Sequence, residues 1–393
     1  MKLKWYTLAL IVPLVVWACS SDNGSEEPNT DDDISISDDD GMVSDDDGTS
    51  VSFDRGALLT NWADNIIVPA YNAFLIDQQA FQAAFTNFQD DPSTVTLSAL
   101  REAWLTAYKA WQRVSLYEIG PAEDDGLRLN INTYPSDITL IEDHIASGSY
   151  DLALPSNRDT KGFPALDYLI NGLGDDDAQI VAVFADAGTG QAYFDYAQDL
   201  LDDIEQQVTT VRDAWTSGYR DTFVQNDGAS ATASVDRFVN DFIFYYEKFL
   251  RAGKMGIPLG VFSGTTAPNT IEALYRPGVS NELFLVGLQA VQDFFNGKHF
   301  GSEQMGEGLA SYLQDLNTVK DGVALDALIN DQFDTARTMV ETLNSFSDEI
   351  ANNNPPTDML LAYDEVQRAV PLLKVDMVSA MSIAIDFVDA DGD

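Results

Sequence analysis

Apolar residues that recur every three or four positions are the feature that most limits how this chain can fold. One run contains Leu97, Leu100, Trp104, Tyr108 and Trp111, and this spacing places a wide apolar stripe along one side of a helix. Alternation of the kind that half-buried strands require is nearly absent. The sequence therefore predicts an all-α protein built from helical bundles. Further runs of the same kind lie at 59–88, 194–215, 235–249, 284–295, 309–316, 328–346 and 360–385.

Two long stretches rich in glycine and proline interrupt the helical pattern, at residues 120–161 and 253–280. Both also carry tyrosine, arginine and apolar side chains, which favours ordered loops over disordered ones. A polar stretch at 218–234 divides the folded part into an N-terminal bundle, 55–225, and a C-terminal bundle, 226–393. Each half contains several helices and one long loop, and this predicts a duplicated bundle.

Residues 1–19 are typical of a targeting segment rather than of a folded domain. Lys2 and Lys4 precede an apolar run that is too short and too early for an ordinary membrane span. The run ends at Ala18-Cys19 in a sequence that resembles a bacterial lipobox, and Cys19 is the single cysteine of the chain. Because no internal disulfide can form, we expect Cys19 to carry a lipid anchor. The alternative is a secretory signal with an incidental cysteine.

Residues 20–54 form a strongly acidic tract with thirteen acidic side chains and no basic one. The tract repeats Ser-Asp-Asp-Asp-Gly at Ser37–Gly41 and at Ser44–Gly48. It holds too few apolar residues to offset the loss of chain entropy, so we expect a disordered tether. Adjacent aspartates do not provide the alternating spacing of a calcium loop.

The charge and the available ligands argue against several functions. With 64 Asp and Glu against 21 Lys and Arg, the chain is not suited to bind nucleic acid. There are two histidines, His144 and His299, and no HExxH or CxxC motif, which argues against a histidine-bound zinc site. We expect His144 on the surface of a helix or turn, and His299 just after a helix. The sequence has no GxSxG motif and no glycine-rich phosphate loop after a strand.

Six segments, taken in order along the chain, carry a more specific signal. They are REAWLTAYKAWQRVSLYEIGP (101–121), INTYPSDITLIEDHI (131–145), GFPALDYLI (162–170), RAGKMGIPLG (251–260), IEALYRPGVSNEL (271–283) and MSIAIDFVDADGD (381–393). In this order they resemble the imelysin-like family of bacterial envelope proteins over nearly all of the mature chain. The resemblance implies two helical bundles, with long ordered loops that meet at a functional cleft between them.

The signature motif of that family, Gly-x-His-x-x-Glu at the start of a helix, is degenerate here. Gly162 matches the glycine, but Pro164 stands at the histidine position and Asp167 at the glutamate position. A proline has no lone pair for a metal, and aspartate is one methylene shorter than glutamate. Two interpretations of Asp167 stay open. It stabilises a helix that starts near Pro164, or it faces a ligand in the cleft.

The resemblance places the ligand site around Gly162, Pro164 and Asp167. Six further residues are candidates for the same site. For each of them the alternative to a ligand contact is a structural role, as a buried hydrogen-bond or ion-pair partner between helices. Glu272 and Arg276 are four residues apart and would pair if their segment is helical. The further candidates are Arg113, Glu118, Tyr134, Asp137, Glu272 and Arg276.

The family includes iron-regulated envelope proteins, and some members have been described as metallopeptidases. We therefore expect an outer-membrane lipoprotein, on the periplasmic or surface face, that binds a ligand linked to iron or haem uptake and has no peptidase activity. An uptake receptor is the implied partner, and the cofactor is either none or iron or another divalent cation. Two alternatives stay open: a metallopeptidase that uses carboxylate ligands, and a non-catalytic scaffold for a membrane partner.

Overall fold

Helices make up nearly all of the regular structure between residues 53 and 386, the part of the chain that the computed structural model describes. Besides the helices, these residues hold one small antiparallel hairpin of β1 (Val319–Lys320) and β2 (Val323–Ala324). The all-α prediction is confirmed. The predictions for the targeting segment, nearly all of the acidic tract and the last seven residues lie outside the described residues. Within residues 53–386, no helix combines the length and the apolar character needed to cross a bilayer.

The first helix is continuous through α1 (Arg55–Asn61), the π-helical η1 (Trp62–Ile67) and α2 (Val68–Asp90). Pro69 has no N–H to donate to the carbonyl of Asn65, four residues earlier. That carbonyl instead accepts a 2.8 Å hydrogen bond from the backbone N–H of Phe300. The proline is thus accommodated by a partner far along the chain.

A first group of helices packs around α2. α3 (Thr94–Val114) returns along α2, and α9 (Gly190–Ala214) packs against another side of it. Phe85 and Phe88 of α2 meet Phe194 of α9 in edge and tilted ring contacts, which accounts for the apolar period of both helices. Shorter helices complete this half: α4 (Pro121–Asp125), α5 (Leu127–Ile131), α6 (Ile138–Ser147), η2 (Pro155–Thr160), α7 (Gly162–Asp167), η3 (Tyr168–Gly172), α8 (Asp177–Phe184), η4 (Trp215–Tyr219) and α10 (Arg220–Gln225).

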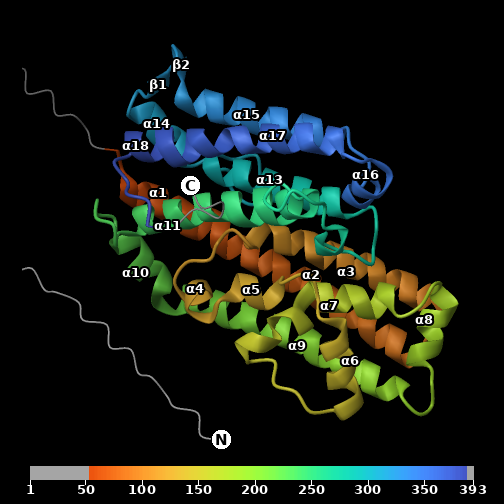
Figure 1. Ribbon diagram of the computed structural model, residues 1–393. Coiled ribbons are helices and arrows are strands. Elements are labelled where there is room, and N and C mark those ends of the chain that lie inside the picture. Colours follow the sequence, from red (N-terminus) through yellow and green to blue (C-terminus); the bar gives the residue numbers. More distant parts are fainter. Residues whose placement is uncertain (1–52, 387–393) are drawn as a thin grey trace, which may run out of the picture. The chain divides into compact units, whose positions relative to one another are not determined.

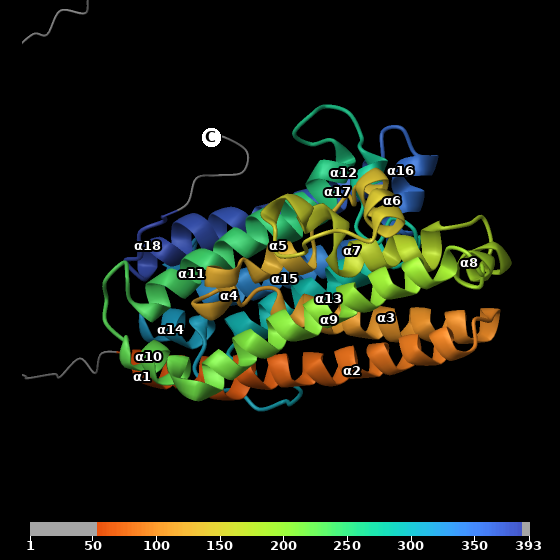
Figure 2. The same cartoon turned by 90° about the horizontal axis from the view of Figure 1, so that it is seen from below.

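A second group contains a long helix formed by α11 (Ser234–Phe244), the π-helical η5 (Tyr245–Gly256) and α12 (Ile257–Leu259). In Figure 1 the blue helices α15 and α17 lie beyond α13, on the side away from the orange α3, and α13 contacts both α3 and α15. Figure 2 shows the same helices from below. The other helices here are η6 (Pro268–Thr270), α13 (Ser280–Phe295), α14 (Leu309–Asp315), α15 (Leu325–Glu341), α16 (Phe346–Asn352), α17 (Thr357–Pro371), η7 (Leu372–Met377) and α18 (Val378–Ala380).

The two stretches expected to be loops are more helical than their glycine and proline content indicates. Residues 120–161 contain α4, α5, α6 and η2. In the second stretch the helix continues past Gly253 and ends only at Leu259, because Gly260 takes a left-handed conformation with φ of 73°. The irregular segment that follows carries Glu272 into the interior.

Candidate ligand-binding site

Glu272 lies at the centre of a buried polar cluster, with only 1 % of its surface exposed. Its Oε1 atom accepts hydrogen bonds from the Tyr108 hydroxyl at 3.1 Å, from Gln112 Nε2 at 3.1 Å and from Asn132 Nδ2 at 2.8 Å. Its Oε2 atom accepts a hydrogen bond from the ammonium group of Lys254. A single carboxylate therefore joins four side chains from three separate parts of the sequence.

The elements that carry this cluster come from both helix groups. Tyr108 and Gln112 lie one turn apart on the same face of α3, and Asn132 follows α5. Lys254 lies in η5, in the second group. Glu272 therefore ties the two groups together, from a loop whose next residue, Ala273, has a positive φ of 56°.

Burial and charge act on Lys254 in opposite directions. Lys254 is 3 % exposed, and this burial lowers the pKa of its ammonium group, while the Glu272 carboxylate raises it and offsets part of the shift. Burial also raises the pKa of the Tyr108 hydroxyl, and the nearby Glu272 charge adds to the effect. The Tyr108 hydroxyl therefore keeps its one proton, for which Asn132 Oδ1 at 2.6 Å and Glu272 Oε1 at 3.1 Å are the two acceptors.

A cavity of about 290 Å³ lies beside the cluster, between α3 and α5 on one side and η5 on the other. Trp111, Tyr134, Tyr245 and Phe249 give it aromatic walls. Its volume is close to the lower end of the range for pockets that bind small molecules. Its polar lining includes Lys254, Lys248, Arg128, Gln112 and Asn132.

The degenerate motif lies in α7 and is fully buried. Gly162 has a positive φ of 72°, and a Cβ there would lie 2.1 Å from the Ile131 carbonyl oxygen, so glycine is required for this close approach. The Asp167 carboxylate accepts hydrogen bonds from the backbone N–H of Tyr275 at 2.8 Å and from Asn171 Nδ2 at 2.9 Å. Burial raises the pKa of Asp167 to about 7, although these two hydrogen bonds favour the charged carboxylate and lower the pKa.

Tyr134 connects the motif with the cavity. It lines the cavity, and together with Pro164 and Asp167 it also lines a much smaller pocket of about 10 Å³. Burial raises the pKa of the Tyr134 hydroxyl, and the Glu272 charge raises it further. Of the residues proposed from sequence, the structure thus brings together Tyr134, Pro164, Asp167 and Glu272.

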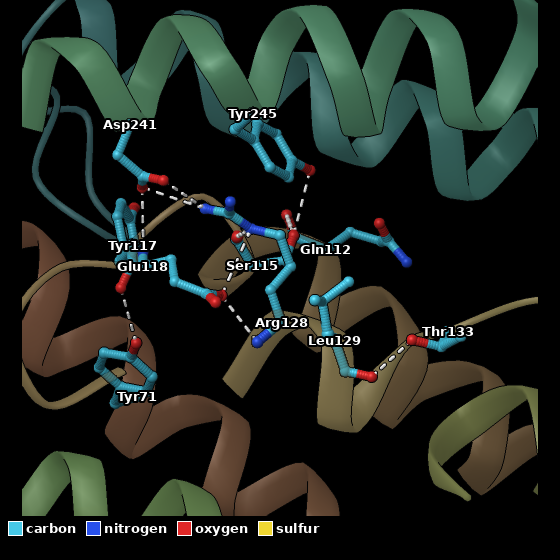
Figure 3. A network of polar contacts seen from close by, with 10 residues as sticks. All are labelled: Tyr71, Gln112, Ser115, Tyr117, Glu118, Arg128, Leu129, Thr133, Asp241 and Tyr245. Atoms are coloured by element: carbon cyan, nitrogen blue, oxygen red, sulfur yellow. Dashed lines mark hydrogen bonds and ion pairs between the residues drawn. The ribbon is translucent and has the colours of Figure 1, made fainter. Parts of the chain in front are cut away.

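Glu118 belongs to a second polar network, which Figure 3 shows around Arg128. The Arg128 guanidinium contacts both Asp241 oxygens at 3.0 and 3.1 Å and donates to the Ser115 carbonyl at 2.6 Å. Glu118 accepts the Arg128 backbone N–H at 2.7 Å, and its own N–H donates to Asp241 at 3.1 Å. Burial raises the pKa of Glu118 to about 7 and that of Asp241 to about 6, although Arg128 opposes both shifts.

Three of the proposed site residues lie elsewhere. Asp137 is exposed and caps α6, where its carboxylate accepts the backbone N–H of Leu140 at 3.0 Å. Arg113 is exposed and lines a separate cleft on the other side of α3. Arg276 contacts Glu102 at 3.4 Å, and its positive charge still lowers the pKa of Asp167.

The predicted pair of Glu272 and Arg276 does not form, because the segment that holds them is a series of turns and not a helix. Glu272 pairs with Lys254 instead. The expectation of a surface histidine is also wrong for His144, which is 8 % exposed and packs against the rings of Tyr150 and Tyr196.

Sequence reasoning missed most of the polar cluster: Lys254, Tyr108, Gln112 and Asn132. Tyr108 and Gln112 were hidden because α3 is buried on most sides near its end, so their positions do not stand out from the apolar stripe. Lys254 carried a usable signal, since RAGKMGIPLG places a lone lysine among small and apolar residues. A buried lysine requires a carboxylate partner, and the loop carboxylate Glu272 supplies it.

The family motif implies a metal, but the residues here do not fit one. Pro164 offers no donor atom, and the Asp167 oxygens are engaged by Tyr275 and Asn171. Among residues 53–386, no three side chains of His, Cys, Asp or Glu gather into a set that could hold a metal ion. The polar cluster instead pairs one carboxylate with one ammonium group.

The fold and the site define a class of protein: an all-α chain of two joined helix groups with a buried charged cluster and a small aromatic cavity where they meet. Comparison with known families then gives the identity at family level. The family model of imelysin, peptidase family M75, matches residues 67–370, so the chain belongs to the imelysin family.

Similar proteins agree with this assignment. Iron-regulated protein A of Synechococcus elongatus is 29 % identical over 86 residues, which cover 21 % of this chain and 24 % of that protein. The matched segment thus spans about a quarter of that relative. A crystal structure described as an iron-regulated protein A precursor from Parabacteroides distasonis has a TM-score of 0.65 at 15 % identity, and covers 82 % of this chain and 95 % of its own. The crystal structure of an imelysin-like protein from Psychrobacter arcticum has a TM-score of 0.65 at 16 % identity. The match covers 85 % of this chain and 97 % of that protein. At these identities the two structures support the fold alone.

Proposed function

We propose that this chain is a lipid-anchored envelope protein of the imelysin family that binds a small ligand beside Lys254 and Glu272 and takes part in iron acquisition without cleaving peptides. Cys19 is its anchor, the outer membrane its location and an iron or haem uptake receptor its partner. The iron link is carried over from two similar proteins that are named as iron-regulated.

One observation carries the binding role: the lysine of a buried ion pair lines a cavity, and its carboxylate partner lies directly behind it. Burying Lys254 and Glu272 costs desolvation energy, which their mutual attraction only partly returns. A pair of apolar residues would stabilise the same helix contact at least as well. A charged pair beside an aromatic cavity is the arrangement expected of a ligand site. The absence of peptidase activity rests on Pro164, which cannot supply the histidine ligand of the family motif.

A cavity-filling variant tests the role in iron acquisition. A Cβ at Gly253 would lie 3.5 Å from the Tyr134 hydroxyl and 3.2 Å from the backbone carbonyl oxygen of Lys248. Gly253→Leu therefore fills the cavity from η5, and the carbonyl of Lys248 must shift slightly to admit it. Gly228→Leu is the matched control, because a Cβ there meets no atom within 4 Å. A strain that lacks the gene is complemented with each form and grown with an iron chelator. We expect the wild type and Gly228→Leu to restore growth and Gly253→Leu to fail, with equal protein levels. Equal growth with and without the gene under iron limitation would contradict the proposal.

A further inference from the structure

The cavity beside Lys254 has a charge opposite to that of the chain. The whole sequence carries 64 acidic and 21 basic side chains. Among the described residues that line the cavity there are three cations, Arg128, Lys248 and Lys254, and no aspartate or glutamate. The acids that pair with these cations lie outside the lining: Glu118 and Asp241 pair with Arg128, and Glu272 pairs with Lys254. The cavity thus presents cations on a surface that is otherwise strongly acidic.

Several lining groups have hydrogen-bonding capacity that the described residues leave unused, and one of them is the buried indole N–H of Trp111. The Lys248 ammonium group lies 5.4 Å from the centre of the Phe244 ring and has no hydrogen-bond or ion-pair partner among residues 53–386. The Tyr134 hydroxyl likewise makes no hydrogen bond to another described residue. One exposed cation and one hydroxyl donor at an aromatic cavity can together receive a carboxylate.

From this arrangement we infer that the cavity binds a small monocarboxylate with an aromatic or aliphatic body. The body packs against Trp111, Tyr245 and Phe249, and the carboxylate meets Lys248 and Tyr134. A cationic ligand is disfavoured, because no aspartate or glutamate lines the cavity and Lys248 adds a positive charge that no carboxylate among the described residues offsets. The inference rests on the proposed function, since it names the ligand class for the same site.

Three probes of matched shape test the charge preference: 3-phenylpropionate, 3-phenylpropanamide and 3-phenylpropylamine. Isothermal titration calorimetry of the full mature chain should show binding of the carboxylate, with the amide weaker by at least about tenfold and the amine undetected. Raising the salt concentration should weaken carboxylate binding, because Lys248 is exposed to solvent. Binding of the amine as tight as that of the carboxylate overturns the inference.

Variants locate the binding. Lys248→Gln should weaken 3-phenylpropionate by about three- to tenfold, and Tyr134→Phe should weaken it to a similar degree. Lys109→Gln is the matched control, since it removes one positive charge from α3 at a residue that does not line the cavity. An effect of Lys109→Gln equal to that of Lys248→Gln overturns the inference, as does no effect of Lys248→Gln.

The growth experiment tests the role in iron acquisition and the titration tests the ligand class, so either claim can be wrong while the other holds. If Gly253→Leu abolishes growth while the amine binds best in the titration, the site functions in iron acquisition but its ligand is not an anion. If the carboxylate binds as expected and Gly253→Leu still restores growth, the ligand class holds and the role in iron acquisition is wrong.

Discussion

The Asp167 carboxylate accepts a 2.8 Å hydrogen bond from the backbone N–H of Tyr275, 108 residues further along the chain. Tyr275 follows Glu272 by three residues, so this bond fixes the loop that brings Glu272 to the buried cluster. The second oxygen of Asp167 accepts from Asn171, one turn further along the helix. Asp167 therefore positions the Glu272 loop and does not cap the start of α7.

Replacing Asp167 with asparagine should change the pH dependence of folding. Because burial raises the pKa of Asp167 from 3.8 to about 7, the folded protein keeps a proton that the unfolded chain has released between these values. Stability contributed by this site therefore falls as the pH rises through that window. Asparagine carries no charge and still accepts the Tyr275 bond, with Asn171 turning its amide.

At pH 5 we expect the free energy of unfolding of Asp167→Asn to be within about 1 kcal/mol of the wild-type value. At pH 8 we expect the variant to be more stable than the wild type by about 1–4 kcal/mol. Urea unfolding of both proteins at the two pH values measures this difference. Asp331→Asn, at an exposed carboxylate on α15, is the control. A difference between Asp167→Asn and the wild type that is the same at both pH values would show that Asp167 is ionised throughout.

Removing Arg128 should destabilise the fold most strongly at high pH. Arg128→Leu leaves the buried carboxylates of Glu118 and Asp241 without their cation, which costs about 3–5 kcal/mol when both are ionised. Their pKa values of about 7 and about 6 mean that at pH 5 both are largely protonated. The cost at pH 5 should therefore be smaller.

Urea unfolding at pH 5 and pH 8 measures the effect of Arg128→Leu. The control is Arg220→Leu, which breaks the exposed pair with Asp64 and should cost no more than about 1 kcal/mol. A larger loss at pH 5 than at pH 8 for Arg128→Leu would contradict the assigned pKa values.

Apolar periodicity was sufficient to predict the helices of this fold, because residues such as Phe85, Phe88 and Phe194 bury one face of a long helix against another. It could not predict η5, since a π-helical segment shifts the register of the stripe by one residue per turn. Proline gave a partial signal, because Pro69 and Pro258 each follow such a segment.

The polar site was only partly predictable, for a different reason. The motif alignment located Pro164 and Asp167, and loop position suggested Glu272. The partners of Glu272 depend on how α3 and η5 pack, and neither Tyr108 nor Lys254 is near it in sequence. Local spacing favoured Arg276 as its partner, but the chain turns at Ala273 and carries Arg276 away toward Glu102. Long-range ion pairs of this kind require the tertiary structure.

Cys19 lies outside the described residues, and its role is open to a direct test. Cys19→Ser removes the only thiol of the chain, so a lipid could no longer be attached there. We expect the wild type in the membrane fraction, labelled by a palmitate analogue, and the variant in the soluble fraction without label. A variant that stays with the membranes, together with an unlabelled wild type, would contradict the lipoprotein interpretation.

Restoring the family motif tests why this chain should lack peptidase activity. Pro164 lies in the first turn of α7, where a backbone N–H has no helical partner, so histidine can replace it without losing a hydrogen bond. Its ring needs space in a buried site, and we expect Pro164→His with Asp167→Glu to lose about 1–3 kcal/mol of stability. Histidine and glutamate three residues apart share one face of the helix and could hold a metal together.

The wild type should bind no stoichiometric zinc and leave casein intact with and without chelator. The double variant should gain measurable zinc affinity by calorimetry, and Pro164→Ala with Asp167→Glu, the control without a nitrogen ligand, should not. Stoichiometric zinc and chelator-sensitive casein cleavage in the wild type would instead establish a peptidase that does without the histidine of its family.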